Sequence, residues 1–433
     1  MDKEITRKAV QGYFMVVAVL MYYFLNEDIN IGLHITYRHA FALVLAISAI
    51  ALFLYKPNIA RGFCVFKSAV VYSVPLAVTT VVSLFIWYEG RVATDVISRG
   101  LSTTFIFTNM FSTALGAGAI LYVFGEKGIW YNLVAILTAN ILMIITIIAT
   151  YGLGNYFSEF VTLITSFADE TGDIIVKAEV HELAFCLGAY LIYMLYKPQK
   201  SLAYFILFFL SLFCFLSAFK RIAMLAIAIS LIFGYMLKFI ARRSKKAAMR
   251  IVTAFSLIII ILLIFYIVII KSDAFELLEK AGISTSGRVG IYNAVDEFYE
   301  FKPGFLGNGI GFLTYQLNSS MEIGVASIHN DFLQHFIDLG FWGYIIWLLS
   351  IILLRVRYYG AKGKVDSAII AFMLVLYLVI SSTTDNTMNY PLLTGVLALI
   401  MTGNGFNENV RTLENKMFGY VSETNRDKDD SLL

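Results

Sequence analysis

The chain has 433 residues, of which 59% are hydrophobic and only 15% are charged, and its formal net charge is +3. Soluble globular proteins are about 45–50% apolar and about 25% charged, so this composition excludes a soluble domain and indicates a polytopic membrane protein. Only five prolines are present, which favours uninterrupted membrane helices and an all-α fold.

Hydrophobic runs long enough to cross a bilayer recur along the whole chain. A hydrocarbon core takes roughly 20 apolar residues, and short runs can borrow residues from their flanks. The sequence predicts about twelve transmembrane helices, at Gln11–Leu25, Ala40–Leu54, Ser68–Tyr88, Thr103–Phe124, Trp130–Tyr151, Glu182–Tyr196, Leu202–Phe219, Ile222–Phe239, Ile251–Ile270, Phe341–Leu354, Ser367–Ile380 and Leu392–Met401. An even number of spans places both termini on the same side of the membrane.

The distribution of positive charge predicts which side that is. With the N-terminus inside, most of the 33 Lys and Arg residues fall in inside segments, above all in Lys238–Arg250. The chain then divides into an N-terminal membrane domain of about nine helices (1–270), an extracytoplasmic loop (271–328), C-terminal membrane helices (329–403) and a cytoplasmic tail (404–433).

A basic pair, Lys220 and Arg221, interrupts the otherwise apolar segment Ser201–Phe239. This segment is too long for one helix, so the pair is predicted to mark a turn on the outer side. A cation in mid-membrane costs roughly 2.5–3.5 kcal/mol on insertion scales, so an arginine at this depth usually has a partner or a ligand. The alternative is an interfacial anchor at the tip of a hairpin.

Arg288 lies in the long outer loop, directly before residues with helical spacing. Ile291, Val295 and Phe298 predict a short amphipathic helix, which Pro303 and the glycine after it would end. A guanidinium in the first turn of a helix is suited to bind a diphosphate. The alternative is an arginine that reaches toward lipid headgroup phosphates.

The next stretch, PGFLGNGIGF, contains Gly304, Gly307, Gly309 and Gly311. No strand precedes it, so it does not match a dinucleotide-binding fingerprint. The glycines favour a tight turn that uses positive φ angles over a phosphate cradle. We expect this turn to fold the loop back toward the membrane.

His329 follows in SIHNDFLQHF, where Ser327 is a plausible helix cap. On such a helix His329 would share a face with Phe332, Leu333 and Phe336, and a helix N-terminus suits the neutral, basic form of a histidine. The alternative is a capping or core histidine bonded to a backbone carbonyl. His335 fits that alternative better, because it falls on a more polar face with Asp331 and Asp338.

Two further observations bear on the site. Asp385 and Asn386 cap the last outer hairpin and could line the same cavity as the long loop. No cluster of residues has metal-ligand spacing, and nothing resembles a serine triad or a phosphate-binding loop.

Four motifs in order, between Ser286 and Gly343, resemble the O-antigen ligase and polymerase superfamily. They are SGRVGIY, PGFLGNGIG, IHNDFLQ and LGFWG. The resemblance implies a membrane glycosyltransferase with a GT-C-like fold in the bacterial cytoplasmic (inner) membrane. Its donor would be a glycan on undecaprenyl diphosphate at the outer face, and its chemistry would invert the anomeric centre. No cofactor, metal or nucleic acid is expected, and a chain-length regulator is a possible partner.

By position in these motifs, the resemblance implies that His329 is catalytic and that Arg288 binds the diphosphate. The outward arginine of the family matches Arg221, for which Lys220 could substitute. Tyr292 and Asn330 are the remaining substrate-binding candidates.

The leading interpretation is a polysaccharide polymerase for O-antigen, capsule or exopolysaccharide, which moves a growing chain onto the next lipid-linked repeat unit. The first alternative is a ligase that transfers the glycan to lipid A-core or to protein. The second is a flippase for lipid-linked oligosaccharides, a class expected to show two similar halves that are not apparent here.

Overall fold

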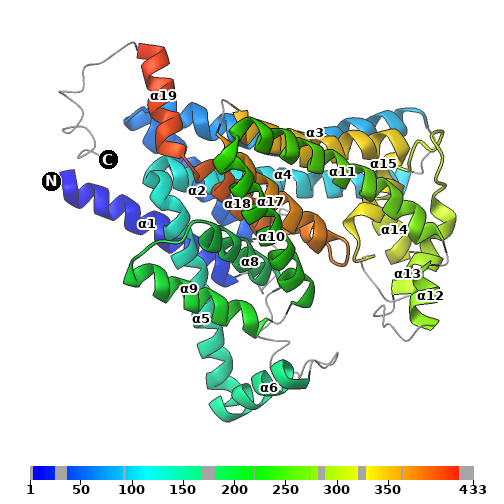
Figure 1. Cartoon of the computed structure of the whole chain (residues 1–433), viewed down its shortest axis with the longest axis horizontal. Coiled ribbons are helices and arrows are strands. Elements are labelled where there is room, and N and C mark those ends of the chain that lie inside the picture. The colour runs from blue at the N-terminus through cyan, green and yellow to red at the C-terminus, as the bar shows by residue number, and fades with distance from the viewer. Residues whose placement is uncertain are drawn as a thin grey trace. The chain divides into compact units, whose positions relative to one another are not determined.

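The computed structural model describes residues 3–24, 37–90, 94–166, 181–218, 220–272, 274–280, 288–319, 328–361 and 364–418 (Figure 1). Across these residues the regular secondary structure consists of helices alone, which turns connect. The elements are α1 (Lys3–Tyr23), α2 (Tyr37–Tyr55), α3 (Ile59–Tyr88), α4 (Thr94–Phe124), η2 (Gly125–Lys127), α5 (Gly128–Tyr151), α6 (Leu153–Ser166), α8 (His181–Tyr196), α9 (Leu202–Ser217), α10 (Arg221–Arg243), α11 (Lys245–Lys271), α12 (Ala274–Lys280), α13 (Arg288–Val295), η3 (Asp296–Phe298), α14 (Phe312–Ser319), α15 (Asp331–Leu348), the π-helix η4 (Leu349–Leu354), α16 (Arg355–Tyr359), α17 (Val365–Ser382), η6 (Thr387–Asn389), α18 (Pro391–Gly403) and α19 (Phe406–Phe418).

Long apolar helices confirm the all-α polytopic membrane fold. Within the described ranges, six helical stretches are long and apolar enough to cross a membrane: Ile59–Tyr88, Thr113–Tyr151, Arg221–Arg243, Lys245–Lys271, Asp331–Tyr359 and Val365–Ser382. Four shorter apolar helices accompany them, at Ala40–Tyr55, Glu182–Tyr196, Leu202–Ser217 and Pro391–Gly403. The total of twelve crossings stays a prediction.

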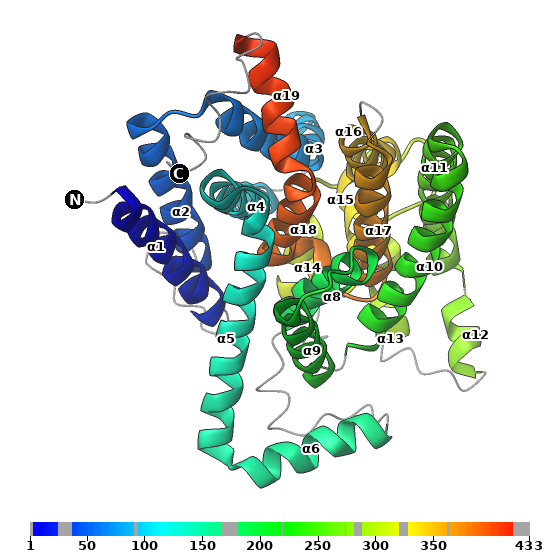
Figure 2. The same ribbon diagram turned by 60° about the vertical axis from the view of Figure 1, so that its left-hand side comes forward.

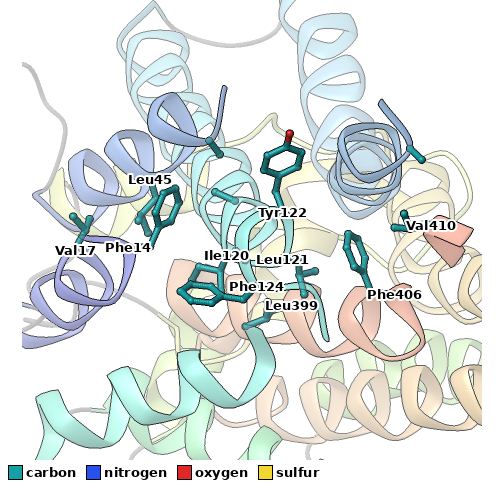
Figure 3. Close-up of a cluster of buried hydrophobic side chains, with 14 residues drawn as sticks. Phe14, Val17, Leu45, Ile120, Leu121, Tyr122, Phe124, Leu399, Phe406 and Val410 are labelled. Atoms are coloured by element: carbon teal, nitrogen blue, oxygen red, sulfur yellow. The ribbon is translucent and has the colours of Figure 1, made fainter. Parts of the chain in front are cut away.

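The chain forms two compact units, and each contains pieces that are distant in sequence. The first comprises Met1–Val70, Asn109–Leu231 and Pro391–Leu433, and the second comprises Val71–Thr108 and Ile232–Tyr390. In the first unit, α1 packs against α2 and α5, and α8 packs against α9 and α18 (Figure 2). Figure 3 shows buried side chains from α1, α2, α4, α18 and α19 meeting in one cluster, including Phe14, Leu45, Leu121, Leu399 and Phe406.

In the second unit, α11 packs against α15 and α17, and the short helices α12, α13 and α14 gather at one end of α11 and α15 (Figure 1). These short helices confirm that the predicted outer loop contains helical turns. Lys271, the last residue of α11, fixes this region: its Nζ lies 2.7 Å from the Asp296 carboxylate and donates to the Tyr299 carbonyl at 3.1 Å.

The glycine-rich stretch forms the predicted turn and folds back onto α15. Gly307, Gly309 and Gly311 have φ angles of 87°, 83° and 87°. The turn meets α15 where that helix is interrupted at Gly340 (φ 69°, ψ −177°): the Gly309 N–H donates to the Asp338 carbonyl at 2.8 Å, and the Phe341 N–H donates to the Phe305 carbonyl at 2.9 Å. The turn therefore supports the middle of α15, whose N-terminus carries the histidine motif.

Candidate active site

α15 begins three residues later than the sequence predicts: a cap at Ser327 would start the helix at residue 328, whereas it starts at Asp331. Asn330 is the N-cap, because its side-chain oxygen accepts hydrogen bonds from the Phe332 and Leu333 N–H groups, each at 3.1 Å. Ser327, the predicted cap, lies outside the described residues. His329 therefore precedes the helix, and the expectation that it shares a helical face with Phe332 and Leu333 is wrong. Asparagine is among the strongest N-cap residues, which explains why the helix starts at this point.

His329 has an unusual backbone conformation. Its φ angle is 49°, and it is the one non-glycine residue with a positive φ among those that the structure describes. This left-handed conformation costs about 1–3 kcal/mol for a non-glycine residue and persists only where neighbouring contacts enforce it. The side chain of His329 is 50% exposed, whereas Asn330 and Asp331 directly after it are fully buried. The backbone turn thus directs the histidine outward and the next two side chains inward.

Asn330 links three helices through its side-chain amide. Its Nδ2 donates to the hydroxyls of Tyr266 on α11 and Tyr292 on α13, both at 3.0 Å. Tyr266 in turn donates to the Thr383 carbonyl at 3.1 Å. Burial raises the pKa of Tyr292, and its hydrogen bond with Asn330 opposes that rise. These contacts hold α13 beside the start of α15.

Asp331 binds the segment that connects α17 to α18. Its Oδ2 accepts from the Met388 N–H at 2.8 Å, its Oδ1 accepts from Asn389 Nδ2 at 3.2 Å, and the Ser382 side chain also bonds to it. A fully buried carboxylate that accepts this many hydrogen bonds is a rigid attachment point. It fixes residues 382–390 against the end of α15.

The same segment brings Asp385 to His329. Asp385 Oδ1 lies 4.0 Å from His329 Nδ1, which is ion-pair range when the imidazole is protonated. That oxygen also accepts from the Asn386 N–H at 2.7 Å and from the Tyr390 hydroxyl at 2.8 Å. The carboxylate is therefore oriented by its own loop. Of the two residues predicted to line this region, Asp385 lies directly against the histidine.

Arg288 reaches the adjacent residue of this loop. It is the first residue of α13, and its Nη2 donates to the Thr384 carbonyl at 2.9 Å. Since Thr384 precedes Asp385, Arg288 and His329 contact consecutive residues. A guanidinium, an imidazole and a carboxylate thus converge at one end of the second unit.

The other predicted site residues have different surroundings. Tyr292 and Asn330 are buried and bond to each other, so both have a structural role. Their assignment as substrate contacts stays a prediction. Lys220 and Arg221 belong to the first unit, where Arg221 begins α10 directly after the turn that follows α9. This confirms the predicted turn. Their part in substrate binding stays a prediction.

His335 has the structural surroundings that the sequence favours. Its ring stacks on Trp347 with centroids 4.0 Å apart, and its Nδ1 lies 2.7 Å from the Asp331 carbonyl oxygen. The expected polar face of α15 is not a solvated one, because Asp331 and Asp338 are both buried. Both carboxylates bond to loops that return to the helix from elsewhere in the chain.

Sequence reasoning missed the roles of Asp331, Tyr266 and Tyr390. The one local signal was the His-Asn-Asp run itself, in which asparagine is the better N-cap and aspartate then falls in the first helical turn. Their partners are distant in sequence, so no spacing pattern could identify them. Among the described residues, no three His, Cys, Asp or Glu side chains are grouped as metal ligands would be.

Comparison with known proteins identifies the region that contains these residues. Residues 205–348 match the family model described as O-Antigen ligase. Among curated proteins, none matches the chain. The matched region runs from α9 to the end of α15 and includes all six predicted site residues, while the loop with Asp385 follows it in sequence. This region is therefore similar to the O-antigen ligase family, which supports the resemblance of its motifs to the O-antigen ligase and polymerase superfamily of membrane glycosyltransferase-like enzymes.

Proposed function

We propose that this protein is a bacterial polysaccharide polymerase of the cytoplasmic membrane. It would transfer a glycan from undecaprenyl diphosphate to the next lipid-linked repeat unit, with residues 271–328 on the outer side and both termini inside. The observation that carries the proposal is the exposed, left-handed His329 beside Asp385, with Arg288 bonded to the residue before Asp385.

In the proposed reaction, His329 removes the proton from the acceptor hydroxyl as the acceptor oxygen bonds to the anomeric carbon. The bond between that carbon and the diphosphate oxygen breaks, and the lipid diphosphate leaves with the bonding electrons. Attack opposite the diphosphate inverts the anomeric centre. Asp385 supports this role, because a carboxylate beside a histidine orients the ring and stabilises the imidazolium that forms.

Arg288 is proposed to bind the diphosphate. A guanidinium offers a planar fork of N–H donors that matches phosphate oxygens, and it keeps its charge at any physiological pH. Its hydrogen bond to the Thr384 carbonyl anchors it next to Asp385, so the leaving group would be held beside the general base. Arg221, or Lys220 in its place, is proposed for the same ligand on the family resemblance alone.

The acceptor distinguishes two candidate functions that share this chemistry. The matched family model is described as O-Antigen ligase, which favours transfer to lipid A-core or to protein as the second candidate. A polymerase would use a second lipid-linked repeat unit and can work with a chain-length regulator. Nothing at His329 or Arg288 depends on which acceptor is used.

A turnover assay tests the proposal directly. The purified protein in lipid would receive undecaprenyl-diphosphate-linked repeat units extracted from the native host, with products resolved by size. A ladder of products that is absent with His329→Ala would establish a polymerase. Transfer only after addition of lipid A-core or a protein acceptor would establish a ligase. No transfer, with lipid-linked glycan crossing the bilayer, would overturn the enzyme proposal in favour of a flippase.

Replacing Arg288 with alanine is expected to lower kcat/KM by about 10²–10³-fold, because transition-state charge on the diphosphate loses a preorganised donor. Arg288→Lys should recover part of this loss, since lysine keeps the charge but not the bidentate fork. Initial rates over a range of lipid-linked donor concentrations would measure both. Arg357→Ala, which removes an arginine that contacts Thr253 at 3.4 Å in the same unit, is the control for loss of positive charge. Equal losses at Arg288 and Arg357 would contradict a specific diphosphate contact.

A further inference from the structure

Asp331 is a fully buried carboxylate that takes no part in the proposed reaction. Its three hydrogen-bond partners, the Met388 N–H, Asn389 Nδ2 and the Ser382 side chain, are all neutral groups. Burying a carboxylate is costly even when its hydrogen bonds are satisfied. In some proteins a buried charged or polar group of this kind contributes a specific geometry more than stability. Here all three partners belong to a single segment, residues 382–390.

This segment is a short, internally bonded turn. The Ser382 and Thr387 hydroxyls lie 2.6 Å apart, and Tyr390 donates to Asp385 at 2.8 Å. Asp331 bonds to residues 382, 388 and 389, so it holds the turn at both of its ends. Asp385 lies between those attachment points, and its Oδ1 is the atom that faces His329 Nδ1. The position of Asp385 relative to the histidine therefore depends on Asp331.

His329 is linked to the turn through the backbone as well, because it lies close to Asp331 in sequence. Asp331 is two residues after His329, and Asn330 between them is fixed by Tyr266 and Tyr292. Any shift of the turn relative to α15 would change the distance between Asp385 and His329, because Asp385 moves with the turn whereas His329 moves with the start of α15. A misplacement of about 1 Å in a catalytic group can cost about 10²-fold in rate.

We propose that Asp331 is a positioning residue that sets Asp385 against His329. It touches neither the glycan nor the diphosphate, and it acts through the turn at residues 382–390. The inference rests on the proposed function for its effect on catalysis. The geometric part, that Asp331 determines how Asp385 meets His329, can be tested without turnover.

Asp338 provides a matched control on the same helix. It is 2% exposed, lies seven residues after Asp331, and likewise accepts hydrogen bonds from backbone N–H groups, those of Gly311 and Leu313. Gly311 is the last glycine of the glycine-rich turn, Leu313 follows it, and neither belongs to the 382–390 segment. Loss of Asp338 should therefore affect stability without changing the environment of His329.

The first experiment measures chemical modification of His329 with diethyl pyrocarbonate, followed by mass spectrometry of the peptide that contains it. We expect Asp385→Asn to change the modification rate about three- to tenfold, because a neighbouring carboxylate controls imidazole reactivity. Asp331→Ala should change the rate in the same direction and by a similar factor, and Asp338→Ala should not. Asn389→Ala removes only one of the contacts and should give a smaller change, which keeps the test decisive if Asp331→Ala does not fold.

The second experiment is a double-mutant cycle in the turnover assay. Asp331→Ala is expected to lower kcat about 10- to 100-fold with KM changed less than about twofold, and Asp331→Asn should restore much of the rate because it keeps an acceptor for Met388. In an Asp385→Asn background, Asp331→Ala should cost less than about twofold more. Equal losses in both backgrounds, as expected for Asp338→Ala, would overturn the inference.

The two experiments separate failure of the inference from failure of the proposed function. An unchanged modification rate of His329 in both Asp331→Ala and Asn389→Ala would overturn the positioning role, whatever the enzyme does. A changed rate together with no glycan transfer by the unmodified protein would leave the positioning geometry supported and overturn the proposed function.

Discussion

Alanine at position 329 is expected to lower the rate of glycan transfer by about 10²–10⁴-fold, the range that a general base contributes. The protein should still fold, because the His329 side chain is 50% exposed and contributes little to the interior. The replacement also keeps a non-glycine residue at a left-handed backbone position, so it does not relieve the strain there. Single-turnover rates with the lipid-linked donor would measure the loss, and size-exclusion chromatography in detergent would confirm folding.

His335→Ala is the matched control, since it removes a histidine six residues later in the same motif. His335 stacks on Trp347 and bonds to the Asp331 carbonyl, so its loss should lower stability by about 1–3 kcal/mol. The folded fraction should retain most of its activity. If His335→Ala lost as much activity per folded molecule as His329→Ala, the assignment of His329 as the base would be contradicted.

Gly340→Ala is expected to have the largest effect on stability. A Cβ at this position would lie 2.2 Å from the Leu306 carbonyl carbon and 2.5 Å from the Gly307 nitrogen, and φ is 69°. Both obstacles are backbone atoms, which cannot move aside as a flexible side chain can. Gly307→Ala should behave alike, because its Cβ would lie 2.4 Å from the Gly340 nitrogen. We expect either variant to lose more than about 4 kcal/mol or to fail to fold.

Gly304→Ala is the control within the same turn. A Cβ there would meet nothing within 4 Å, and its φ is not positive, so stability should change by no more than about 0.5 kcal/mol. Thermal unfolding in detergent, followed by light scattering and intrinsic fluorescence, would compare the three variants. A Gly340→Ala protein as stable as Gly304→Ala would show that the turn does not pack on α15 at this point.

Local sequence signals were sufficient for the elements around the site. The spacing of Ile291 and Val295 predicted α13, in which both side chains are buried. The run of glycines predicted the turn, and three of its four glycines have positive φ angles. The basic pair predicted the turn between α9 and α10. Each signal depends on neighbours within about two helical turns, so a single sequence contains all the information that is needed.

The conformation of His329 could not be predicted from its neighbours in the sequence. The sequence predicted Ser327 as the cap, whereas Asn330 caps α15. The choice depends on Asn330 bonding to Tyr266 and Tyr292, residues 64 and 38 positions earlier in the chain. Those contacts draw Asn330 inward, which leaves His329 outside the helix in a left-handed conformation.

Composition and hydrophobic runs were enough to predict a helical membrane protein, and the motifs predicted Arg288 and His329 as site residues through a family resemblance. Composition and helical period act along the chain, and the motifs are contiguous, so both can be read directly. The contact of Asp385 with His329, and the attachment of the turn that contains Asp385 to Asp331, follow from the packing of distant segments, because Asp331 and Met388 are 57 residues apart. Such contacts depend on how helices pack and where their connecting turns meet, and no local pattern encodes that register.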